Sequence, residues 1–168
     1  MVEMLTFAGL AFAGGMLCMH NCLHSPRHDA ALVIYGGKQP AVHFYGHHFV
    51  IPLLRKARYV NLDAFEVKDP KTVGWTAKIR PRVSDQNYIA TTAAAIQEHG
   101  ETAVKQQAES VVHNAVCQTL RQMQSDETLR EPNMFSKNVF AAAESGLRKL
   151  GMDIQSFRLN NSETLHHS

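Results

Sequence analysis

Residues 75–96 read WTAKIRPRVSDQNYIATTAAAI, and the spacing of the apolar side chains changes once within this stretch. From Val73 to Val83 apolar and polar residues alternate, which predicts a strand that is buried on one face. Its other face is basic and carries Thr76, Lys78, Arg80 and Arg82. After Ser84 or Asp85, both common N-caps, apolar residues recur at helical spacing until Gly100. A strand that leads directly into a helix is therefore the centre of the expected fold.

Upstream of this passage the sequence predicts short strands. Runs at 31–35 and 41–45 are each closed by glycine. Residues 49–54 are expected to form an edge strand or a bend, because Pro52 cannot donate a hydrogen bond to a neighbouring strand. Residues 57–67 alternate as one further run, and a turn is expected at 69–71.

Downstream, the pattern predicts two more helices and a last strand. Residues 101–123 carry one apolar face, and 125–130 form a polar connector. Pro132 suits the first turn of a third helix, which Gly151 would end. Residues 152–159 return to strand character. This order of N-terminal antiparallel strands, helices and a final strand predicts an α+β domain.

The N-terminal segment differs from the rest, because residues 4–26 contain no Asp, Glu, Lys or Arg. As a helix rising about 1.5 Å per residue, residues 4–23 would measure about 30 Å, close to one hydrocarbon thickness. We expect a membrane-anchoring helix, which either spans the bilayer or re-enters it. Its apolar side chains include Leu5, Phe7, Leu10, Phe12, Met16 and Leu17. A secretory signal peptide, which Glu3 disfavours, and a buried core helix, which Gly9, Gly14 and Gly15 disfavour, are the alternatives.

Charge and cysteine content indicate the cellular compartment and the kind of partner. Basic residues follow the apolar segment, so the positive-inside rule places the soluble domain on the cytoplasmic side of the membrane. A net charge of +2 is too mild to indicate a nucleic-acid partner. Three cysteines without a framework pattern fit a reducing compartment. The expected organisation is an anchor with its linker at 1–29, the α+β domain at 30–160 and a flexible tail at 161–168.

Motifs for catalysis are missing from the sequence: it has no glycine-rich phosphate loop, GxSxG, HExxH or CxxC. We therefore expect no enzymatic activity, no catalytic residue and no cofactor. A soft metal ion is conceivable at a Cys/His cluster that comprises Cys18, His20, Cys22, His24 and His28. On a helix, however, the Cys pair and the first His pair point about 200° apart, so no metal site is predicted. A metal-handling protein remains an alternative.

Residues 49–58 combine apolar and basic side chains in a pattern that suits shallow contact with an anionic leaflet. The residues concerned are Phe49, Ile51, Leu53, Leu54, Arg55, Lys56 and Arg58. Each cation near such a surface contributes about 1 kcal/mol. The alternative is an apolar strand within the core that ends in solvated charges.

Four stretches, taken in order, resemble the stomatin, prohibitin and flotillin superfamily, whose shared module is the SPFH or band 7 domain. They are 31–67, 75–96, AVCQTLRQM at 115–123, and 132–161. The opening passage is most similar to flotillin-like members. Two departures stand out: the passage between Val67 and Trp75 is short, and no sustained heptad repeat follows the last strand.

The resemblance implies a non-enzymatic, membrane-associated scaffold that oligomerises and organises membrane microdomains or regulates neighbouring membrane proteins. Its partners would be membrane lipids, further copies or related chains, and a membrane-protein client. Without a heptad repeat, we expect lateral contacts between globular domains instead of a coiled coil. The resemblance also favours S-acylation of Cys18 or Cys22. A dedicated hetero-oligomeric regulator of a membrane protease or channel is the main alternative.

Overall fold

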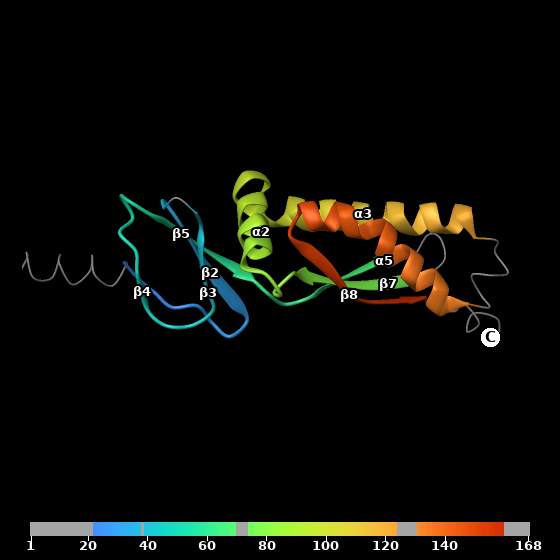
Figure 1. Ribbon diagram of the computed structural model, residues 1–168, viewed down its shortest axis with the longest axis horizontal. Coiled ribbons are helices and arrows are strands. Elements are labelled where there is room, and N and C mark those ends of the chain that lie inside the picture. Colours follow the sequence, from blue (N-terminus) through green and yellow to red (C-terminus); the bar gives the residue numbers. More distant parts are fainter. Residues whose placement is uncertain (1–21, 38, 70–73, 124–130, 160–168) are drawn as a thin grey trace, which may run out of the picture. The chain divides into compact units, whose positions relative to one another are not determined.

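The strands and helices of this chain fall into two units, Met1–Asn61 and Leu62–Ser168. The computed structural model describes residues 22–37, 39–69, 74–123 and 131–159 (Figure 1). The first unit contains strands β1 to β5, and the second contains β6 to β8 with helices α2, α3 and α5.

In the first unit, the apolar strand β2 (Ala30–Tyr35) is the middle of a three-stranded antiparallel sheet. It pairs with β3 (Ala41–His43) on one side and β5 (Lys56–Asn61) on the other. A separate two-stranded ladder joins β1 (Leu23–His24) to β4 (His48–Phe49). Leu32 and Ile34 of β2 pack with Val50, which follows β4, so the loop beyond β4 is fixed to the sheet.

In the second unit, strand β7 (Trp75–Pro81) lies between β6 (Phe65–Asp69) and β8 (Met152–Leu159), and both pairings are antiparallel. The alternation expected for this strand is confirmed. Trp75, Ala77, Ile79 and Pro81 are buried, and the side chains between them are partly or fully exposed. One face of the sheet therefore belongs to the core and the other is polar.

Three helices of the described ranges lie between β7 and β8 in the sequence. Helix α2 (Gln86–His99) begins after Asp85, whose side-chain oxygen accepts the amide hydrogen of Asn87 at 2.9 Å. Helices α3 (Glu101–Gln122) and α5 (Pro132–Lys149) place their apolar stripes in one core with the buried face of the sheet. Within this core the rings of Trp75 and Phe157 stack with centroids 5.9 Å apart.

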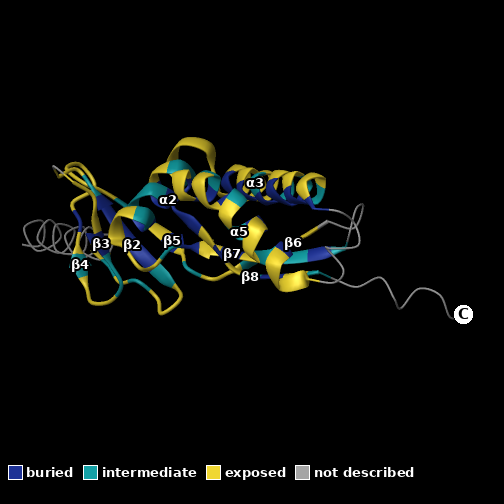
Figure 2. Ribbon diagram, turned by 45° about the vertical axis from the view of Figure 1, so that its right-hand side comes forward, coloured by how far each residue is buried: buried dark blue, intermediate teal, exposed yellow. Residues whose placement is uncertain are grey.

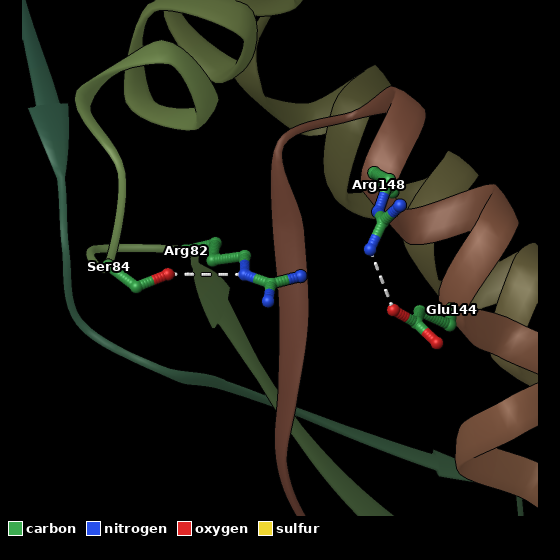
Figure 3. A network of polar contacts seen from close by, with 4 residues as sticks. All are labelled: Arg82, Ser84, Glu144 and Arg148. Carbon is green, nitrogen blue, oxygen red and sulfur yellow. Dashed lines mark hydrogen bonds and ion pairs between the residues drawn. The ribbon is translucent and has the colours of Figure 1, made fainter.

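The connection between β7 and α2 is bonded to the turn between α5 and β8. The amide of Arg82 donates to the carbonyl of Gly151 at 2.9 Å. The Arg82 side chain donates to the hydroxyl of Ser84 at 3.2 Å, and on α5 Arg148 bonds Glu144 at 2.9 Å (Figure 3). The bond from Arg82 to Gly151 therefore ties the point at which the strand becomes a helix to the turn before β8.

The expected α+β class is confirmed, as is the order of strands, helices and final strand. The single run expected at 57–67 is wrong. Strand β5 ends at Asn61 and pairs with β2, whereas β6 starts at Phe65 and pairs with β7 in another sheet. The chain bends at Asp63 between the two strands. The alternation of apolar and polar residues therefore runs through 57–67 although the chain moves from one sheet to another. Residues 4–21 of the expected N-terminal helix lie outside the described residues, and its last residue, Leu23, lies in strand β1. Within the described ranges no helix is long and apolar enough to cross a membrane.

Candidate membrane-contact surface

Large apolar side chains are exposed mainly in the first unit. Of nine such residues in the described ranges, seven lie before residue 62: Leu23, Tyr45, Phe49, Ile51, Leu53, Leu54 and Tyr59. Figure 2 shows the loops beside β3 and β4 coloured mostly as exposed. Scattered single apolar residues need no explanation, but such a concentration is typical of a surface that contacts a partner or a membrane.

The loop of residues 49–56, called the contact loop below, owes its exposure to one buried residue. Val50 is 1% exposed, and its amide donates to the carbonyl of Cys22 at 2.7 Å. Its neighbours Phe49 and Ile51 are 55% and 42% exposed. Because successive side chains of an extended chain point in opposite directions, burying Val50 turns both neighbours outward.

A tight turn follows and carries Leu53, the most exposed of these large apolar residues. The amides of Leu54 and Arg55 both donate to the carbonyl of Ile51, at 3.0 and 2.9 Å. Leu53 is 96% exposed and Leu54 71%. The expectation of a bend around Pro52 agrees with this geometry. The alternative, an apolar strand within the core, holds for Val50 alone, because Phe49, Ile51, Leu53 and Leu54 are exposed.

Gly36 allows the contact loop to approach β2 closely. Its φ is +117°, and a Cβ atom there would lie 2.6 Å from the carbonyl oxygen of Leu54. A side chain at this position would displace the turn. The exposed leucines are therefore presented by a turn that rests against backbone.

The basic residues beside the loop differ in accessibility. Arg55 and Lys56 are exposed, whereas Arg58 is partly buried and faces Val33 in the β2–β5 register. Burial raises the pKa of Tyr35, and the nearby charge of Arg58 opposes part of that rise. Arg55 and Lys56 are thus the cations that are most available to an anionic surface.

Two histidines lie beside the start of the loop. The rings of His43 and His48 have centroids 3.8 Å apart, and His48 Nε2 lies 3.0 Å from the carbonyl oxygen of Tyr45. Burial and, to a smaller extent, the charge of His48 lower the pKa of His43. Protonation of His43 on acidification is therefore opposed by its burial and by the charge of His48.

Several residues predicted for function lie outside the described residues: Leu5, Phe7, Leu10, Phe12, Met16, Leu17 and Cys18. Cys22 is described and is buried, so its thiol is not accessible to an acylating enzyme in this conformation. Among the residues that the structure describes, no three His, Cys, Asp or Glu side chains come together as a metal site.

Sequence reasoning missed Leu23 and Tyr45 as part of this surface. The apolar pattern predicts Leu23 at the end of the anchoring segment, but it pairs with Phe49 in the β1–β4 register and is 52% exposed. Tyr45 is 84% exposed and precedes Gly46. A bulky aromatic residue next to a turn glycine is the signal that could have indicated it.

These features define a class of protein: an α+β module with an apolar, cation-flanked loop. Residues 26–164 match the SPFH domain / Band 7 family, so the chain belongs to this family. Members of the family are typically membrane-associated scaffolds and are generally not enzymes. A search of the curated proteins found no significant match.

Proposed function

We propose that this protein is a non-enzymatic, flotillin-like scaffold that attaches to membranes with its α+β domain on the cytoplasmic side. Copies associate laterally and organise membrane microdomains or regulate neighbouring membrane proteins. The observation that carries the proposal is the exposure of Leu53 and Leu54 directly beside Arg55 and Lys56. Family membership supports the membrane association.

The energetics favour a weak contact for each copy. Burying one leucine side chain fully contributes about 1.5–3 kcal/mol, and each basic residue near an anionic leaflet adds about 1 kcal/mol. Such a contact is reversible for a single copy. Several linked copies on one surface bind far more tightly, because each further contact is made at a high effective concentration.

The lipid contact is tested on a fragment of residues 22–168, which lacks the N-terminal segment but keeps β1 for its pairing with β4. The fragment is sedimented with anionic vesicles. Replacing Leu53 and Leu54 together by Ser should weaken binding at least about 100-fold, since two leucine burials are lost. Met134→Ser, which changes an exposed apolar residue of the second unit, serves as the control and should leave binding unchanged. Equal binding of the double variant and the parent would refute the contact.

Assembly is tested by cross-linking the full chain in membranes. A ladder of homo-oligomers supports the scaffold. A single discrete band with an unrelated chain supports the alternative, a dedicated regulator of a membrane protease or channel.

A further inference from the structure

The polar face of the second unit's sheet carries an ordered set of charges. In the β6–β7–β8 register, two rows of side chains cross this face. One row consists of Glu66, Lys78 and Ser156, and the next of Lys68, Thr76 and Arg158. Side chains that face each other in this way have Cβ atoms about 4.5–5.5 Å apart. Charges from three strands, distant in sequence, are thus brought together.

A β-bulge shapes this face. Lys78 faces Ser156 but the next residue, Ile79, faces Ile154, so Gln155 has no partner in the register. An extra residue on one strand bends it and increases the local twist. Here the face is hollowed: a cavity of about 300 Å³ is lined by Glu66, Thr76, Lys78, Ser156 and Arg158.

Positive charge exceeds negative charge in and beside this hollow. Glu66 Oε1 bonds Lys68 Nζ at 3.3 Å, and both side chains are well exposed. Within the part of the chain that the structure describes, neither Lys78 nor Arg158 has an ion-pair partner. Because Lys68 compensates the charge of Glu66, the positive charges of Lys78 and Arg158 remain. The hydroxyl groups of Thr76 and Ser156 line the same hollow.

We propose that this hollow binds a phosphate monoester. Such a group carries a charge of about −1.5 to −2 at neutral pH, which matches the excess of Lys78 and Arg158. The guanidinium group offers a planar pair of donors and the ammonium group a compact charge, while the Ser156 hydroxyl donates a further hydrogen bond. Glu66 opposes the anion, so binding is weak. The inference concerns the second unit alone and does not rest on the proposed function.

Two sources supply this chemistry: a soluble phosphorylated molecule and a phosphorylated lipid head group. The first experiment titrates inorganic phosphate into the full chain in a non-ionic detergent, followed by ³¹P NMR. Lys78→Gln and Arg158→Gln should each raise the dissociation constant about fivefold, because one charge-assisted bond is lost at an open site. Glu66→Gln should lower the constant about twofold, which no unfolded variant can do.

Arg121→Gln is the matched control, since Arg121 is an exposed cation on α3 of the same unit. It should leave the dissociation constant unchanged. The proposal is overturned if Lys78→Gln and Arg158→Gln bind like the parent, if Glu66→Gln does not tighten binding, or if Arg121→Gln loses as much as they do. Equally tight binding of dimethyl phosphate, a monoanion, also overturns it.

A second experiment separates the two sources. The full chain is floated with phosphatidylcholine vesicles with and without phosphatidylinositol 4-phosphate. If Lys78→Gln reduces the extra binding that the phosphorylated lipid gives, the hollow takes the lipid head group. If that extra binding is absent or unaffected while phosphate binding in solution falls, it takes the soluble molecule. Both outcomes support the site.

Discussion

The side-chain oxygen of Thr92 lies 3.1 Å from the carbonyl oxygen of Gly151, so helix α2 is bonded to the turn that leads from α5 into β8. The same hydroxyl lies 2.9 Å from the carbonyl oxygen of Leu150 and 3.1 Å from that of Tyr88. Thr92 is fully buried. The hydroxyl hydrogen of Thr92 thus has three carbonyl oxygens within reach, one on α2 and two in the turn between α5 and β8.

Thr92→Val should reduce the free energy of unfolding by about 1–3 kcal/mol, because it removes the donor from buried carbonyl groups and puts a methyl group in its place. The measurement is chemical denaturation followed by circular dichroism. Thr91→Val is the control: Thr91 bonds the carbonyl of Asn87 at 2.8 Å on the exposed side, and its loss should cost less than about 0.5 kcal/mol. Equal losses in the two variants would contradict this role for Thr92.

Gly151→Ala should be more harmful than the same change at Gly100. A Cβ atom at Gly151 would lie 2.1 Å from the carbonyl oxygen of Tyr88 and 2.9 Å from the amide of Thr92, both backbone atoms. Gly100 also has a positive φ, of +86°, but nothing lies within 4 Å of its Cβ position. We expect Gly151→Ala to cost about 1–3 kcal/mol more than Gly100→Ala, the range for a forced overlap. Thermal unfolding of the two variants measures the difference, and similar melting temperatures would argue against the close approach.

The charges beside the contact loop should matter only for anionic membranes. Replacing Arg55 and Lys56 together by Gln should weaken binding of the 22–168 fragment to anionic vesicles about tenfold or more, at about 1 kcal/mol for each cation. Added salt should reduce this difference, since it screens exposed charges. Vesicles of phosphatidylcholine alone should bind parent and variant alike. A defect that persists there would mean that the substitutions disturb the loop itself.

Acidification should weaken the first unit through His43. Because its pKa in the folded protein is lowered from 6.5, the unfolded chain binds more protons than the folded chain in this range. Stability contributed by neutral His43 is therefore fully present above pH 6.5, falls as the pH drops below it, and is lost below the folded pKa. The protection factors of the β2 and β3 amides, which are corrected for the intrinsic pH dependence of amide exchange, should therefore fall on acidification. This fall in the protection factors should be smaller in His43→Gln, and an unchanged pH dependence in that variant would rule out the role of His43.

Much of the second unit was predictable because its local signals agree with its tertiary structure. The alternation from Trp75 to Pro81 and the glycine after α2 each have one structural interpretation, and the structure adopts it. Of the two expected caps, Ser84 and Asp85, the structure uses Asp85. The apolar stripes of α3 and α5 also face the core as expected. In these segments, side-chain spacing alone decides which face is buried.

The rest depended on partners that spacing does not identify. Alternation through 57–67 indicates strand conformation but not which strand lies alongside, so the change of sheet between Asn61 and Phe65 was invisible. For Phe49 to Leu54 the same apolar residues fit a core strand or an exposed loop. The bond from Val50 to Cys22 decides between them, and it joins segments 28 residues apart. Likewise, the basic face of β7 was expected, but its neighbours Glu66 and Arg158 come from other strands.

Trp75 is the only tryptophan of the chain, and it is buried in the core of the second unit. Its intrinsic fluorescence is consequently a reporter for that unit alone. Thermal unfolding recorded by tryptophan fluorescence follows the loss of the core of the second unit. It does not report the unfolding of the sheet that presents the contact loop. The unfolding of the second unit can therefore be followed without an added label. The unfolding of the first unit must be followed through its tyrosines or its backbone amides.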